Sequence, residues 1–99
     1  MLPPYPKSKK SIDGVISFPP LHCLNPVTNI ATIVAEVDGN RISCRVKIRD
    51  LRKKFQVFHG EPMMALTQHR GEIESAARNL INNKKFESDG SIMINYQDL

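Results

Sequence analysis

Two apolar-rich runs, residues 28–37 and 41–48, flank Asp38-Gly39-Asn40, and this arrangement constrains the fold more than any other feature of the chain. An Asp-Gly pair suits the positive φ angles of a tight turn between antiparallel strands. Residues that alternate along a strand fall on opposite faces of a sheet. The sequence therefore predicts a hairpin with one buried face and one exposed face.

A two-residue turn at Asp38-Gly39 also predicts which residues lie opposite one another. On the buried face the predicted pairs are Ala35 with Ile42, Ile33 with Cys44, and Ala31 with Val46. On the other face they are Glu36 with Arg41, an ion pair, and Thr32 with Arg45, a polar pair. A turn shifted by one residue would change these partners and would keep the same residues on each face.

The remaining strands are expected at the two ends of the domain. Residues 15–18 predict a first strand that ends at Pro19-Pro20, and residues 91–96 predict a last strand whose branched residues share one face. The stretch 21–26 has no periodicity and contains Asn25-Pro26, a turn signal, so we expect a loop there. The position of the last strand in the sheet is left open.

Two helices are expected between the hairpin and the last strand. The first begins at Leu51 with Asp50 as its N-cap. The second begins at Pro62, a favoured first-turn residue, and runs to about Lys84, with Gly71 marking either a close approach or a bend. The order β-β-β-α-α-β predicts an α+β fold in which an antiparallel sheet of about four strands has two helices packed on one face.

The chain has 99 residues and a formal net charge of +4 that is unevenly distributed. Residues 1–54 contain ten of the fourteen Lys and Arg residues against four acids, whereas residues 55–99 contain four basic and six acidic residues. Residues 1–13 hold three prolines and three lysines, so we expect a flexible basic arm before a single α+β domain at 14–99. The excess charge could attract a polyanion or could serve only to keep a small domain soluble.

Cysteine usage and the uncharged segments indicate where the protein resides. Cys23 and Cys44 show no metal-ligand spacing, and the sequence does not begin with the apolar segment of a secretory signal. The longest uncharged run, residues 14–35, is interrupted by prolines and does not predict a membrane span. We therefore expect reduced thiols and a cytoplasmic protein without membrane contact.

The hairpin and the segments after it resemble a known family. The run VAEVDGNRISCRVKIRDLRKKF is similar to the hairpin and first helix of DUF1488, a small bacterial family of unknown function. The segments HRGEIESAARNLI and DGSIMINYQDL are similar to its long helix and closing strand, so the resemblance covers about residues 14–99. The matching positions are Gly39 and Cys44 in the hairpin, Arg70, Ile73 and Ala77 in the helix, and Asp98 at the end of the strand. The resemblance implies a compact α+β domain and brings no activity, substrate, cofactor or catalytic residue.

No cluster of residues in the sequence indicates a catalysed reaction. His22 adjoins Cys23, but a Cys–His nucleophile pair needs an orienting third group, so a pair of loop residues is the favoured interpretation. His69 and Glu72 lie three residues apart on one helix face, a spacing more typical of a surface polar pair than of a metal site. Glu72 and Glu74 point about 200° apart on a helix, and no glycine-rich phosphate loop is present. We expect a protein that is not an enzyme and that has no cofactor, metal or small-molecule substrate.

Strand alternation places a row of cations on the exposed face of the second hairpin strand. The candidate nucleic-acid-binding residues are Arg41, Arg45, Lys47 and Arg49 on this strand, with Arg52 and Lys53 shortly after it. Successive side chains on one face of a strand are about 6.6 Å apart, so such a row could follow a phosphate backbone. Few aromatic residues are available to stack on bases, and no known nucleic-acid-binding motif is present. A solvated charged face is the alternative.

Three apolar residues, Ile30, Val34 and Met93, are expected on the sheet face that the helices leave uncovered. They form the candidate interaction patch, suited to a homodimer or another protein partner, unless they are scattered surface residues. The expected function is a non-enzymatic binding or protein-interaction module, and non-specific nucleic-acid binding or regulation through the basic face is the alternative. A protein interface must bury the three apolar residues, whereas nucleic-acid binding needs Arg45 and Lys47 exposed and free of carboxylate partners.

Overall fold

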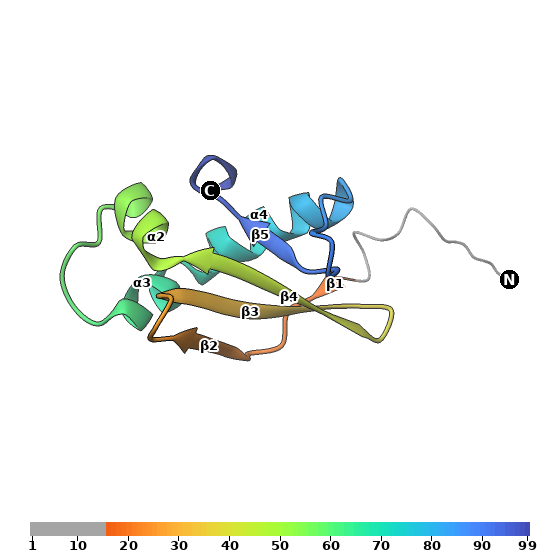
Figure 1. Ribbon diagram of the computed structural model, residues 1–99, viewed down its shortest axis with the longest axis horizontal. Coiled ribbons are helices and arrows are strands. Elements are labelled where there is room, and N and C mark those ends of the chain that lie inside the picture. Colours follow the sequence, from red (N-terminus) through yellow and green to blue (C-terminus); the bar gives the residue numbers. More distant parts are fainter. Residues whose placement is uncertain (1–15) are drawn as a thin grey trace, which may run out of the picture.

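The computed structural model describes residues 16–99 and contains one five-stranded sheet with helices on one of its faces (Figure 1). The strands are β1 (Ile16–Ser17), β2 (His22–Asn25), β3 (Ile30–Val37), β4 (Asn40–Lys47) and β5 (Ile92–Ile94). The helices are α2 (Ile48–Phe55), α3 (Pro62–Gln68) and α4 (Arg70–Asn82), and a short 3-10 turn, η1 (Tyr96–Asp98), follows β5. The α+β class expected from the sequence is confirmed. The arm expected at residues 1–13 lies outside the described residues.

The hairpin of β3 and β4 has the register expected from the Asp-Gly turn. All five predicted pairs occur, from Ala31 with Val46 at one end to Glu36 with Arg41 beside the turn. Asp38 and Gly39 have φ angles of 53° and 83°, which are the left-handed values that this two-residue turn requires. Arg41 Nε donates to Glu36 Oε2 at 3.0 Å, which confirms the predicted ion pair.

Replacing Gly39 and Gly71 with alanine should change stability in opposite directions. An alanine at position 39 would keep a φ near 83°, which L residues rarely adopt, so the free energy of unfolding should fall by about 1 kcal/mol. Gly71 lies in the first turn of α4, and apart from the adjoining residues and the helix's own backbone no atom lies within 4 Å of where a Cβ would lie, so of its two suggested roles the close approach is wrong. Alanine should therefore raise the free energy of unfolding by about 0.5 kcal/mol. Urea denaturation of both variants checks this, and changes of the same sign would contradict it.

The segment 21–26, expected to be a loop, contains β2, which pairs antiparallel with β3 beside β1. The turn signal at Asn25 is correct, because Asn25 Oδ1 accepts hydrogen bonds from the backbone N–H groups of Val27 and Thr28 at 2.9 and 3.3 Å. Only Leu24 of this strand is even half-buried. An edge strand this exposed carries almost no apolar periodicity from which it could be predicted.

Strand β5 lies at the other edge of the sheet and is parallel to β4, with Cys44 opposite Ile92 and Val46 opposite Ile94. The expectation of a wholly antiparallel sheet is therefore wrong at this strand. The three helices form the long connection from β4 to β5 that a parallel pair needs. Compared with the expected order, the fold has one more strand, β2, and one more helix.

The helices begin and end at other residues than the sequence suggests. Helix α2 starts at Ile48, directly after β4, and the expected N-cap Asp50 lies inside its first turn. The earlier start brings Ile48 fully into the core. The single helix expected over 62–84 is interrupted at His69, where φ is −117°, and is divided into α3 and α4. The His69 ring stacks on Phe55 with 4.0 Å between ring centroids, so the break lies against α2.

Burial alternates along β3 and β4, because one face of the sheet packs against the helices and the other does not. In Figure 1, β3 and β4 lie in front of α3 and α4, and the sheet face turned toward the viewer carries no helix. The fully buried large side chains come from the covered face and from the helices, and they include Ile33, Val46, Ile48, Leu51, Leu66, Ile73, Ile92 and Ile94. The uncovered face is therefore where the candidate residues must be sought.

Candidate functional site

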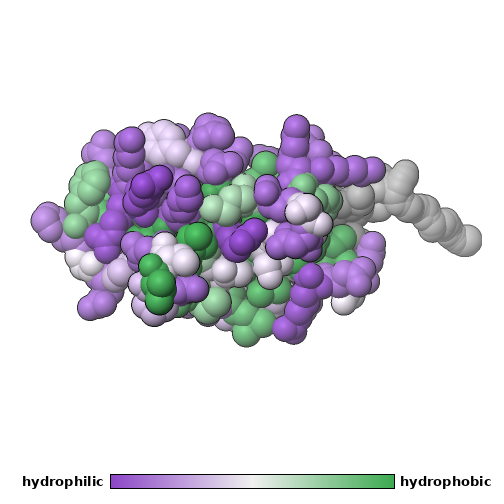
Figure 2. All heavy atoms as spheres, in the orientation of Figure 1, coloured by the Kyte–Doolittle hydropathy of each residue, from purple (hydrophilic) through white to green (hydrophobic). Residues whose placement is uncertain are grey.

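The sheet face without helices, which we call the outer face, carries most of the candidate residues. Strand pairing places one row straight across it, from Cys23 through Thr32 and Arg45 to Met93. The neighbouring rows pair Ile30 with Lys47 and Val34 with Ser43. Figure 2 shows this face, with hydrophobic side chains set among hydrophilic ones. The outer face is thus a mixed surface in which apolar and charged side chains alternate.

The three patch residues predicted from the sequence, Ile30, Val34 and Met93, all lie on the outer face. Each is half-buried by its neighbours on the sheet. Ile30 and Val34 lie on β3, and Met93 lies on β5, so the polar side chains of β4 separate them. The patch is therefore two apolar areas on either side of a basic strand.

Two of the predicted nucleic-acid-binding cations are held by carboxylates. Arg41 contacts Glu36, and Arg45 Nη2 donates to Ser91 Oγ at 2.8 Å with Asp89 Oδ2 at 4.0 Å. The Ser91 hydroxyl donates to Asp89 Oδ1 at 2.6 Å, and this bond and the Ser91 N–H hold the pKa of the Asp89 carboxyl below its usual value. Nucleic-acid binding needs cations that are free of carboxylate partners, and Arg45 does not meet this requirement.

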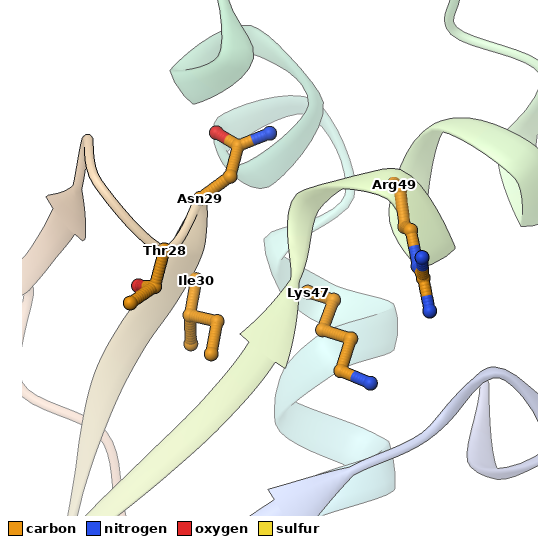
Figure 3. A pocket seen from close by; sticks show the side chains of 5 residues that line it. All are labelled: Thr28, Asn29, Ile30, Lys47 and Arg49. Atoms are coloured by element: carbon orange, nitrogen blue, oxygen red, sulfur yellow. The ribbon is translucent and has the colours of Figure 1, made fainter.

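Lys47 and Arg49 differ from these two cations. Within residues 16–99, neither contacts a carboxylate. Both line a pocket of about 240 Å³ at the end of the hairpin, together with Thr28, Asn29 and Ile30. Figure 3 shows the pocket with the charged ends of Lys47 and Arg49 on the same side of β4. Sequence reasoning did not find Thr28 and Asn29, whose only signal is the turn after Asn25-Pro26.

The last two candidate cations contact other elements. Arg52 Nη2 donates to the carbonyl oxygen of Gly60 at 3.1 Å. The ammonium groups of Lys53 and Lys54 lie 5.6 and 5.1 Å from the ring centroid of Tyr96 in η1. Of the six candidate cations, Arg41, Arg45 and Lys47 lie on the outer face of β4 as expected, whereas Arg49, Arg52 and Lys53 lie in α2.

The side chains of His22 and Cys23 do not come together. Because β2 is a strand, Cys23 lies on the outer face, whereas His22 lies on the helix side, where Arg70 Nη1 donates to its Nδ1 at 3.0 Å. His69 and Glu72 form the polar pair that their spacing indicates, with 3.4 Å between Nδ1 and Oε2. In the described part of the chain, no three His, Cys, Asp or Glu side chains lie close enough to hold a metal ion. No helix there is long and apolar enough to cross a membrane.

Cys23 and Cys44 are both free thiols and should differ in reactivity. Burial raises the pKa of the Cys44 thiol to about 11, so at about pH 8 a thiol reagent should modify only the exposed Cys23 until urea unfolds the protein.

The raised pKa of Cys44 also predicts how the stability of the fold changes with pH. Because this pKa lies above the unfolded value of 9.0, the contribution of the neutral Cys44 thiol to the free energy of unfolding is complete below about pH 9 and is lost as pH rises toward 11. Cys44→Ala should weaken that alkaline fall in stability. Rapid modification of both native thiols would contradict the burial.

Comparison with known proteins identifies the fold family. The family model described as "Protein of unknown function (DUF1488)" matches residues 16–94. The crystal structure of a protein of unknown function from the DUF1488 family of Shewanella loihica PV-4 has a TM-score of 0.74 at 20% sequence identity, and the match covers 82% of this chain and 92% of that one. Curated proteins give no significant match. Because the family match runs from β1 to the end of β5 and confirms the resemblance noted in the sequence, the chain belongs to the DUF1488 family.

Proposed function

We propose that this protein is a non-enzymatic interaction module that binds a protein partner on its outer face. The observation that carries the proposal is a sheet face that no helix of residues 16–99 covers and that still holds Ile30, Val34 and Met93. Burying these side chains under a partner would remove apolar surface from water, which favours association. The proposal keeps the cytoplasmic location expected from the reduced thiols.

The charges around the patch indicate which partner would fit. Strand β4 presents Arg41, Arg45 and Lys47 on the outer face, and the acidic residue that β3 presents there is Glu36. A partner with acidic residues around an apolar centre would bury the patch and face these cations. We therefore expect an acidic polypeptide segment with apolar side chains.

A protein partner accounts for the outer face better than nucleic acid does. Arg41 and Arg45 already contact Glu36 and Asp89, so fewer cations are available to displace counterions from a phosphate backbone. None of the paired outer-face residues of the five strands is aromatic, so bases would find no stacking platform. Non-specific nucleic-acid binding stays the alternative and is tested in parallel.

Selection from a random twelve-residue peptide library on the immobilised full chain tests the proposal. We expect enriched peptides that combine acidic and apolar residues and bind with dissociation constants on the order of micromolar. The variant Val34→Asp/Met93→Asp should lose this binding, because it places charge in both apolar areas and repels an acidic partner. The matched control is Phe58→Asp/Phe86→Asp, which changes two exposed hydrophobic residues outside the sheet and should bind normally.

Peptide enrichment that is absent, or that survives Val34→Asp/Met93→Asp, would overturn the proposal. Sedimentation of the full chain adds a second readout: a dimer that this variant dissociates would support the outer face as an interface, with a second copy as the partner. Fluorescence anisotropy with random single-stranded RNA and duplex DNA covers the alternative. Binding that falls steeply with salt and is lost in Arg45→Glu/Lys47→Glu would support nucleic acid in place of a protein.

A further inference from the structure

The pocket beside Lys47 and Arg49 has walls that the backbone holds together. Ile30 and Lys47 are partners in the β3–β4 ladder, and the Ile48 N–H donates to the carbonyl oxygen of Asn29 at 3.1 Å. Asn29 has a φ of 58°, a left-handed conformation that asparagine tolerates, where the chain enters β3. The hairpin therefore fixes the backbone around the pocket before a ligand arrives, which lowers the entropic cost of binding.

The positive charge of this pocket has no counterion within residues 16–99. Lys47 is half-buried and Arg49 is exposed, and neither contacts a carboxylate there. Asp50 follows Arg49 in the sequence but does not line the pocket. Two cations on one wall, as in Figure 3, repel each other until an anion lies near both. The pocket therefore favours a negatively charged group.

The size and the remaining walls decide which anion fits. A volume of about 240 Å³ is below the roughly 300–1,000 Å³ typical of small-molecule pockets, and it suits a single side chain. Ile30 supplies an apolar wall next to Lys47. A carboxylate on a short aliphatic stem would use both the cations and this wall, because its oxygens accept hydrogen bonds from ammonium and guanidinium groups while the stem contacts Ile30.

We infer that this pocket binds a Glu or Asp side chain of the partner. The inference rests on the proposed function, and it adds the residue type that anchors the partner at the edge of the outer face. Lys47 and Arg49 donate to the carboxylate, and the aliphatic stem of that residue contacts Ile30. A phosphate group would meet the same two cations without using the apolar wall.

Matched peptides test the inference. Each selected peptide is compared with versions in which one Glu is replaced by Gln or one Asp by Asn. At the anchoring position we expect binding to weaken about tenfold. The variant Lys47→Gln/Arg49→Gln should bind both versions equally weakly. The control Lys84→Gln/Lys85→Gln removes the same charge from exposed residues after α4 and should keep the difference.

Titration with the α-amides of N-acetylglutamate and N-acetylglutamine, followed by amide NMR, tests the pocket without a selected peptide. Only the compound with the side-chain carboxylate should shift the amide signals of Thr28, Ile30 and Arg49, at concentrations on the order of millimolar, and Lys47→Gln/Arg49→Gln should abolish these shifts.

The outcomes separate the inference from the proposed function. If selected peptides bind the outer face and tolerate every Glu→Gln and Asp→Asn change, the inference fails and the proposed function stands. If no peptide is selected while the α-amide of N-acetylglutamate shifts the pocket amides, the proposed function fails and the pocket remains a carboxylate site. RNA that binds more tightly than the peptides and depends on Lys47 and Arg49 would assign the pocket to phosphate and overturn the inference.

Discussion

Replacing Ile33 with alanine should lower the free energy of unfolding by about 3 kcal/mol, whereas replacing Val34 should lower it by less than about 1 kcal/mol. The two residues are neighbours in β3 and differ in the face of the sheet that they occupy. Ile33 is fully buried on the helix side, so its truncation leaves a cavity in the core. Val34 is half-buried on the outer face, where water can fill the space. Urea denaturation of both variants measures the difference.

The Val34→Ala variant serves as the matched control, and it also tests whether the outer face is uncovered in the free protein. A loss of more than about 2 kcal/mol at Val34 would mean that this side chain is packed in a second core. Equal losses at Ile33 and Val34 would contradict the one-sided sheet. Ile33→Val, which removes one methylene group, should cost only about 1 kcal/mol and shows whether the loss scales with the volume removed.

Replacing Arg70 with alanine should lower the free energy of unfolding by about 2 kcal/mol and loosen one edge of the sheet. The Arg70 side chain is 17% exposed. It donates to the carbonyl oxygen of Pro19 at 2.7 Å, to His22 Nδ1 at 3.0 Å and to Glu74 Oε2 at 2.9 Å. Its removal leaves the partly buried carbonyl oxygen of Pro19 and carboxylate of Glu74 without this donor. Through its bonds to Pro19 and His22, Arg70 connects the β1–β2 segment to α4, and β2 is a short strand of four residues.

Hydrogen exchange locates the effect of Arg70→Ala. Amides of β2 should exchange faster than in the wild type, while those at the centre of β4 should follow global unfolding only. Arg52→Ala is the matched control, since Arg52 donates to a single exposed carbonyl, that of Gly60, and should cost less than about 0.5 kcal/mol. Unchanged exchange in β2, or a larger loss for Arg52→Ala than for Arg70→Ala, would contradict the role of Arg70.

The β3–β4 hairpin could be predicted residue by residue because its determinants are local. Asp38-Gly39 specifies the turn, and alternation specifies which residues face the core. The pairing of Cys44 with Ile92 joins segments far apart in the sequence, and no local pattern reports it. The interruption at His69 likewise coincides with a contact to Phe55 on another helix, which no local pattern reports.

The electrostatics of the candidate site could be predicted only in part. Strand alternation correctly predicts that Ile30 and Lys47 both lie on the outer face. Whether a cation is free depends on groups from distant loops, and Ser91 and Asp89 reach Arg45 because β5 pairs in parallel with β4. The pocket needs the left-handed conformation of Asn29, which the residue type permits and does not dictate.

Methyl NMR of the full chain with the most strongly selected peptide tests the proposed docking surface most directly. We expect the methyl signals of Ile30, Val34 and Met93 to shift on binding and to show contacts with peptide protons. The methyl signals of Ile73 and Ile81, which are buried in α4, should stay in place. Peptide contacts confined to the helices, with the three outer-face methyl signals unchanged, would contradict docking on the uncovered face of the sheet.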